Sequence, residues 1–205
     1  NVDKDEGTRL LTELEEYYGG DCGLTPDMLG RISGEIELIR AYTAFNDAAL
    51  MRERLKNSHM LLAGRSDIAN EEKIITFGSP HALYLYYRQA GSLAQTKDCV
   101  QDMFRYYTEM AGGCGRGFDN LLEAEFLLET GAFDEAELYA RRAEHKAQSL
   151  NQVSVSICAA FTIARASAAR GKFNESIDTM TELRSEVDGS GRPILSSAYD
   201  VSVGY

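Results

Sequence analysis

Apolar side chains recur at intervals of three and four residues along almost the whole chain, which is the period of an amphipathic α-helix. The pattern predicts helices over residues 6–18, 25–42, 46–62, 79–90, 93–111, 119–130, 134–150, 153–170 and 174–187, and a last one after Pro193. Residues 71–77 are a candidate for one further short helix. Apolar and polar residues alternate at 153–156, but the surrounding pattern assigns that segment to a helix. The sequence therefore predicts an all-α protein.

A short turn sequence recurs at a constant interval. Gly131-Ala132-Phe133-Asp134-Glu135-Ala136 is matched forty residues later by residues 171–176 and, more loosely, forty residues earlier by residues 91–96. Gly131 can take the left-handed conformation that ends a helix, Phe133 can fill the corner, and Asp134 can cap the next helix. A period near 40 residues is typical of solenoids built from helix pairs.

A fourth copy of the turn, Phe45-Asn46-Asp47-Ala48, fits the period only with an eight-residue insertion, which falls in residues 63–77. The sequence thus predicts a tetratricopeptide-like (TPR-like) α–α superhelix, as a single domain over residues 1–205. Its repeats would cover roughly residues 25–63, 78–111, 118–150 and 153–187, and a truncated terminal helix would cover 193–205. Because the last residues break off in an apolar helical pattern, we expect a fragment of a longer protein.

The second helix of each predicted pair has inward positions spaced by four and then three residues, which is one helix face. These positions are Ala136, Ala140 and Ala143; Ser176, Met180 and Leu183; Thr96, Val100 and Met103; and Ala48, Arg52 and Leu55. Arg52 does not suit an inward position, and Met51 is the alternative. Any helical bundle would show such spacing, so the constant phase of the glycines is what favours a solenoid.

The net charge of −11 argues against binding to nucleic acid or to an anionic membrane surface, since both need clustered Lys and Arg. It also suits simple solubility. No apolar run approaches the length of a membrane span, and no signal peptide opens the chain. The four cysteines are scattered without a C-x-x-C pair, and Cys99 and Cys158 are expected in the core. A reduced, cytoplasmic setting is expected.

No catalytic or metal-binding motif stands out, so we expect a protein that is not an enzyme and needs no cofactor. The glycine-rich residues 112–117 lack the Lys-Ser or Lys-Thr of a phosphate loop and follow no strand, which favours a flexible turn between repeats. His59, His81 and His145 lie on separate predicted helices without further ligands at helical spacing, so no metal site is expected.

The first helices of the pairs would line a concave groove. Aromatic and charged side chains fall on that predicted wall, which suits a sugar, a peptide or a small amphipathic effector. The candidate ligand-binding residues are Glu37, Arg40, His81, Tyr84, Arg88, Glu125, Glu129 and Arg165. The alternative is that the tyrosines belong to the core and the charges form a solvated face.

Three stretches resemble the helical-repeat region of LuxR-type, MalT-like bacterial transcriptional regulators. They are residues 21–26 with 31–35, residues 76–80 with 83–88, and residues 112–115. The resemblance covers nearly the whole chain. It implies a TPR-like superhelix that senses an inducer, placed between a nucleotide-hydrolase module and a C-terminal helix-turn-helix. This sequence shows neither a nucleotide loop nor a basic recognition helix.

Two functions are therefore expected. The first is the ligand-sensing and oligomerisation region of such a regulator, with a small-molecule inducer or peptide on the concave face. Its partners would include the other domains of the same regulator and another copy of this chain, without direct contact to nucleic acid or membrane. The alternative is a TPR-type protein-interaction scaffold with no small ligand.

Overall fold

The computed structural model describes residues 4–19, 23–69, 79–189, 191 and 193–204, and this part of the chain is helical, without a strand. The helices are α1 (Lys4–Gly19), α2 (Pro26–Thr43), α3 (Ala48–Leu62), the short 3₁₀ helix η1 (Leu83–Leu85), α4 (Leu93–Met110), α5 (Phe118–Glu129), α6 (Phe133–Gln148), α7 (Val153–Ala169), α8 (Phe173–Gly189) and α9 (Pro193–Gly204). The all-α prediction is confirmed. The candidate helix at 71–77 lies outside the described residues.

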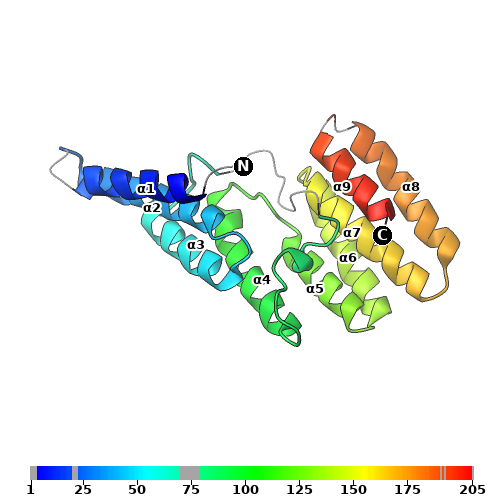
Figure 1. The fold of residues 1–205 in the computed structure, drawn as a ribbon. Coiled ribbons are helices and arrows are strands. Elements are labelled where there is room, and N and C mark those ends of the chain that lie inside the picture. Colours follow the sequence, from blue (N-terminus) through cyan, green and yellow to red (C-terminus); the bar gives the residue numbers. More distant parts are fainter. Residues whose placement is uncertain (1–3, 20–22, 70–78, 190, 192, 205) are drawn as a thin grey trace.

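Each helix packs mainly on its neighbours in sequence, which gives a helical repeat-like arrangement. Figure 1 shows α1–α4 stacked on one side and α5–α9 on the other. The largest core cluster runs from α2 to α7, and a smaller one joins α7, α8 and α9. Among the described helices, none combines the length and the apolar character needed to cross a membrane.

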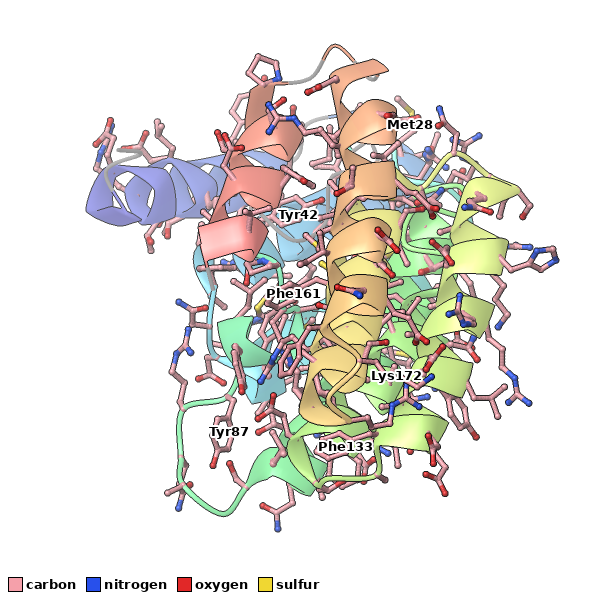
Figure 2. The ribbon with its side chains drawn as sticks, turned by 90° about the vertical axis from the view of Figure 1, so that its right-hand side faces the viewer. Met28, Tyr42, Tyr87, Phe133, Phe161 and Lys172 are labelled. Carbon is pink, nitrogen blue, oxygen red and sulfur yellow. The ribbon has the colours of Figure 1, made fainter. Side chains whose placement is uncertain are left out.

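The turns at Gly131 and Gly171 have the predicted form. Both glycines are left-handed, with φ of +85° and +78°. Gly131 N–H donates to the Leu128 carbonyl and Ala132 N–H to the Leu127 carbonyl, at 3.2 and 2.9 Å. Gly171 and the residue after it repeat this pair of bonds, which satisfies the last carbonyls of the preceding helix. Phe133 and Lys172, which follow the two glycines, lie toward the same edge of the array (Figure 2).

Two details of the predicted turn differ. Asp134 does not cap α6, because the helix begins one residue earlier and its N-cap is Ala132, without a side-chain bond. Asp134 instead pairs with Arg170. Phe133 packs into the corner against Leu128 and Ala136 as predicted. Its counterpart Phe173 remains 65% exposed, so the corner is filled in only one of the two turns.

The first pair is also regular, but its predicted register was wrong by three residues. The left-handed residue is Asn46, with φ of +79°, and Asp47 caps α3 by accepting from the Leu50 amide. Asn46 therefore corresponds to Gly131, and Met51 to Ala136. The buried face of α3 is Met51, Leu55, Ser58 and Leu62, whereas Arg52 is exposed. Asn can replace Gly at such a turn because it tolerates the left-handed region.

The largest error concerns residues 79–90. They were predicted as a helix, but only Leu83–Leu85 form one short 3₁₀ turn. The second predicted repeat therefore has a regular second helix, α4, without a first helix. Gly91 keeps the left-handed φ of +82°, yet its N–H donates to the Tyr87 hydroxyl at 3.1 Å and not to a helix carbonyl.

The described cysteines are free thiols. Cys158 is fully buried, as predicted, and its thiol donates to the Ser79 carbonyl at 3.4 Å. Cys99 is only half-buried, so its core placement was wrong. Cys114, at the end of the main core cluster, is buried instead.

Candidate functional site

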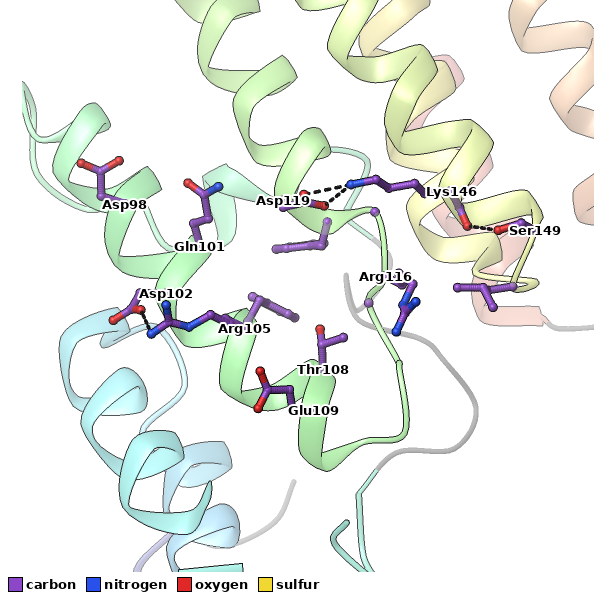
Figure 3. Close-up of a pocket in the computed structure, with 15 residues that line it drawn as sticks. Asp98, Gln101, Asp102, Arg105, Thr108, Glu109, Arg116, Asp119, Lys146 and Ser149 are labelled. Atoms are coloured by element: carbon purple, nitrogen blue, oxygen red, sulfur yellow. Dashed lines mark hydrogen bonds and ion pairs between the residues drawn. The ribbon is translucent and has the colours of Figure 1, made fainter. Parts of the chain in front are cut away.

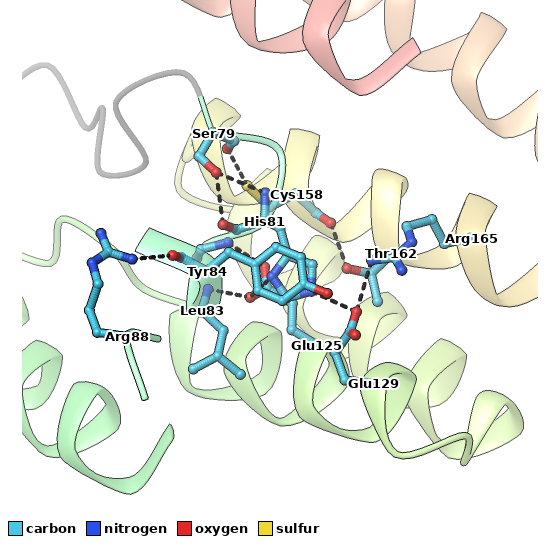
Figure 4. A network of polar contacts seen from close by, with 11 residues as sticks. Ser79, His81, Leu83, Tyr84, Arg88, Glu125, Glu129, Cys158, Thr162 and Arg165 are labelled. Carbon is cyan, nitrogen blue, oxygen red and sulfur yellow. Dashed lines mark hydrogen bonds and ion pairs between the residues drawn. The ribbon is translucent and has the colours of Figure 1, made fainter. Parts of the chain in front are cut away.

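Five of the eight candidate residues gather in one place. His81 and Tyr84 come from the irregular segment 79–92, Glu125 and Glu129 from α5, and Arg165 from α7. Figure 4 shows their polar groups converging between these three elements. We call these five residues the His81 cluster. The sequence grouped them only by assuming a first helix at 79–90, so their meeting has a different structural cause.

That cause is Glu125, which is fully buried. Its two carboxylate oxygens accept hydrogen bonds from the backbone amides of Ala82 and Leu83, at 2.8 and 2.6 Å. A buried carboxylate is retained only where such donors compensate for the lost water. Glu125 therefore fixes segment 79–92 onto α5.

His81 lies between two carboxylates and is almost completely buried. Its Nδ1 is 3.1 Å from Glu125 Oε2, and its Nε2 is 3.5 Å from Glu129 Oε1. Neither ring nitrogen has a well-aligned hydrogen bond to another described residue. The ring stacks on Tyr84 at a centroid distance of 3.9 Å. Tyr84 in turn hydrogen-bonds Glu129, which also accepts from Arg165 at 2.9 Å.

The surroundings shift the pKa values of the two glutamates in opposite directions. Burial raises the pKa of Glu125, against the opposing effects of His81 and the two amides. Contact with His81, supported by Tyr84 and Arg165, lowers the pKa of Glu129 to about 2. Burial and the nearby Glu129 raise the pKa of Tyr84 to about 12. Glu129 is therefore ionised, and Tyr84 keeps its proton, at neutral pH.

The other three candidate residues lie apart from this cluster. Glu37 and Arg40 form an ion-pair network on α2, where Glu37 also pairs with Arg54 at 3.2 Å and Arg40 also pairs with Glu15 of α1. Arg88 donates to the carbonyls of Tyr84, Leu85 and Tyr87. These carbonyls would otherwise accept from amides in a regular helix, so Arg88 stabilises the irregular form of the segment.

The His81 cluster uses most of its polar atoms internally, which makes it an anchor for segment 79–92. Its solvent-facing part consists of Tyr84, which is exposed, and of Arg165 and Glu129, which are half-buried. Within the described ranges, no three His, Cys, Asp or Glu side chains are grouped so that they could hold a metal ion.

A second site has the form of a groove, of about 940 Å³, that sequence reasoning missed. It lies between α4, the glycine-rich link and the C-terminal end of α6 (Figure 3). We call it the α4 groove. One wall is a face of α4 with Asp98, Gln101, Asp102, Arg105, Thr108 and Glu109. Arg116, Asp119 and Lys146 form the other wall, and Phe104, Phe118 and Leu150 contribute apolar surface.

The α4 groove follows from the missing first helix. α6 packs extensively on both α5 and α7, whereas α4 packs extensively on α3 and much less on α5. Without a regular helix at 79–90 to separate them, α3 and α4 come into direct contact, for example through His59 Nε2 and Glu109 Oε2 at 2.7 Å. The weaker packing of α4 on α5 leaves room for the groove.

The glycine-rich link forms one rim of this groove and is held in place. The buried Gln152 accepts from the Gly115 amide at 2.9 Å and donates to the Gly113 carbonyl at 3.4 Å. Gly112, Gly113, Gly115 and Gly117 all have positive φ, which explains the glycine content. The prediction that residues 112–117 form a turn is therefore confirmed. The prediction that this turn is flexible does not fit, because Gln152 holds it in place.

No sequence motif marks the α4 groove, because its walls come from surface residues of three separate segments. The only available signal was the run of charged residues on the outer face of residues 98–109, which is also what a solvated face would show. No protein-family model, curated protein or solved structure matches this chain.

Proposed function

We propose that this chain is a TPR-like superhelical domain that binds other proteins, and that a segment of the partner lies in the α4 groove. One observation carries the proposal: an open groove of about 940 Å³ has charged walls of both signs above apolar side chains. Interfaces commonly combine an apolar centre with a charged and polar rim.

The shape of the groove favours a polypeptide over a small molecule. Pockets for small molecules cover about 300–1,000 Å³ and enclose most of the ligand behind mainly apolar walls. The α4 groove has a similar volume, but it is not enclosed and it carries seven charged side chains. A polypeptide segment can run along such a surface and leave at both ends.

The test is a selection from a displayed library of random 16-residue peptides on the full chain. Gln101→Trp would fill the groove, and Glu182→Trp places the same side chain on the exposed face of α8 as the control. We expect enriched peptides to bind the wild type and the control and to lose binding to Gln101→Trp, with unchanged far-UV circular dichroism. Equal binding to all three proteins would contradict the proposal.

A second candidate function is the effector-sensing region of a LuxR-type, MalT-like regulator, with the effector on the concave face and a resulting bias in self-association. The observation that favours it is the partly exposed group of Tyr84, Glu129 and Arg165. An aromatic ring beside two hydrogen-bonding charges suits a sugar or a small polar metabolite. Calorimetry with a panel of maltodextrins and metabolites tests it. If no compound gives a binding heat that is lost in Arg165→Ala, the result would count against this function.

A further inference from the structure

We infer that the occupant of the α4 groove is an amphipathic helix of a partner protein that carries basic residues on the flank facing α4. This inference rests on the proposed function and specifies the class of partner. It comes from the spacing of the wall residues, the position of the groove in the array, and the distribution of charge.

The α4 wall has the geometry of a helix-packing face. Its groove residues are spaced by one and three along the sequence, from Asp98 to Glu109, so they form one stripe along the helix. Eleven residues correspond to about 16 Å of helix. Such a straight stripe matches the ridge of a second helix better than an extended strand, whose side chains alternate with a period of two.

The position of the groove supports the same occupant. The second helices α3 and α6 each have a closely packed partner on both sides: α3 has α2 and α4, and α6 has α5 and α7. α4 has extensive packing only with α3. A helix about 10–12 Å across fills roughly 500 Å³ per turn, so about 940 Å³ accommodates about two turns.

The charged residues of the groove walls indicate which charges the two flanks of the partner helix should carry. Asp98 is weakly paired: within the described ranges its one ion-pair contact is Lys97 at 3.5 Å, and Lys97 itself binds Glu123 at 2.7 Å. On the opposite wall, Arg116 is exposed, and although its backbone amide donates to the Gly113 carbonyl at 3.2 Å, its guanidinium pairs with no group in the part of the chain that the structure describes. Lys or Arg of the incoming helix would therefore face Asp98, and an acidic residue would face Arg116.

The other wall charges are already used, and Glu109 contacts His59 Nε2 at 2.7 Å. Arg105 pairs with Asp102 at 2.9 Å, and Lys146 pairs with Asp119 at 3.1 Å. Asp98 and Arg116 are thus the two charges that recognise a partner at the lowest cost, because no internal ion pair of comparable quality has to break. The chain's net charge of −11 also favours encounter with a basic partner.

The apolar lining of the groove indicates that a third face of the partner helix is apolar. Phe104 and Phe118 line the groove but are only 8% and 1% exposed, so Leu150 is the exposed apolar side chain among its lining residues. A narrow apolar stripe on the partner would pack here. Basic, apolar and acidic residues then occupy successive faces of one helix, as in other helix-in-groove complexes.

The experiment reads the sequence pattern of the peptides selected from the 16-residue library. We expect apolar residues at i, i+3 or i+4, and i+7, with Lys or Arg on one flank. A synthetic peptide of this pattern should gain helical circular dichroism on binding. Asp98→Lys should weaken its binding about tenfold, whereas Glu182→Lys on α8 should leave it unchanged. Exchanging the peptide's flanking Lys for Glu should restore binding to Asp98→Lys.

Each outcome decides between the two claims. Groove-dependent peptides that lack a helical period, or that prefer acidic residues against Asp98, would overturn the helix inference and leave the proposed function standing. If no selected peptide depends on the groove, both are overturned. Asp98 is exposed, so Asp98→Lys should fold normally, and its unfolding midpoint checks this.

Discussion

The unit around Gly131 and the unit around Gly91 begin from the same local signal and reach different structures. Both glycines are left-handed, with φ of +85° and +82°. At Gly131, two backbone N–H groups donate hydrogen bonds to carbonyls in the last turn of α5 and so end that helix. At Gly91, the backbone N–H donates to the Tyr87 hydroxyl instead. The comparison shows that the left-handed turn can form whether or not a helix precedes it.

Side chains decide which structure forms, and Glu125 and Cys158 among them come from elsewhere in the chain. Segment 79–92 gives its Ala82 and Leu83 amides to Glu125, its Ser79 carbonyl to Cys158, and its Tyr84 carbonyl to Arg88. Several of these backbone groups would otherwise bond to each other in a helix. Tertiary hydrogen bonds therefore replace a first helix, and the α4 groove is the result.

The largest expected effect comes from removing the main anchor of the irregular unit. Glu125→Ala leaves two buried amides without an acceptor, which should lower the free energy of unfolding by about 3–5 kcal/mol. Chemical denaturation measures this. Glu135→Ala, at an exposed position of α6, is the control and should change stability by less than about 0.5 kcal/mol. A loss below about 1 kcal/mol for Glu125→Ala would mean that the segment is held by other contacts.

The second prediction asks whether the first pair follows the regular unit in the corrected register. Met51→Ala removes a buried side chain and should cost about 2–4 kcal/mol, whereas the neighbouring Arg52→Ala should cost less than about 0.5 kcal/mol. Thermal or urea unfolding of the two variants gives the comparison. A larger loss of stability for Arg52→Ala than for Met51→Ala would contradict the corrected register and support the one with Arg52 inward.

The third prediction compares the glycines directly. A Cβ at Gly131 or Gly91 would meet no heavy atom within 4 Å, so a substitution reports only the cost of positive φ. Gly131→Val should cost about 1–3 kcal/mol because two helices fix this turn. Gly91→Val should cost less, since the irregular segment before it can adjust. Equal costs, measured by urea unfolding, would show that both turns are equally constrained.

The smallest effect concerns pH. The pKa of Glu129 is about 2 in the folded protein and near 4.5 without its partners. The ionised form is thus favoured in the fold, so its stabilisation is complete above about pH 4.5 and is lost as the pH falls toward 2. Because Glu129 is partly exposed, we expect only about 1 kcal/mol. Glu129→Gln should flatten the stability curve between pH 5 and pH 2; an unchanged slope would contradict the assigned shift.

The helices with strong periodic patterns could be predicted from sequence almost to their ends. Residues 119–130 and 134–150 were assigned from apolar spacing and the Gly131 turn, and α5 and α6 begin and end within two residues of those limits. The predicted register of the first pair was wrong because Phe45 resembles Phe133 in residue type but is not its structural equivalent. The residue equivalent to Gly131 is the left-handed Asn46, and a search for repeated glycines cannot find an asparagine.

Segment 79–92 could not have been predicted in the same way. Its Ser79-Pro80 start and its apolar spacing resemble a helix, and the residues that prevent one include Glu125 and Cys158, far along the chain. The His81 cluster was anticipated in part, because His81, Tyr84, Glu125, Glu129 and Arg165 were assigned to one wall. The α4 groove was not, since it depends on how far α4 separates from α5, a distance set by the missing helix.

The most direct test measures the backbone conformation of residues 79–92 by NMR, through Cα and Cβ secondary chemical shifts. Residues 120–129 of α5 serve as the internal reference. We expect continuous helical shifts in the reference and, in residues 79–92, helical values confined to the neighbourhood of Leu83–Leu85. Continuous helical shifts from residue 80 to residue 90 would contradict this structure, because a regular first helix would then separate α3 from α4 and the origin of the α4 groove would be lost.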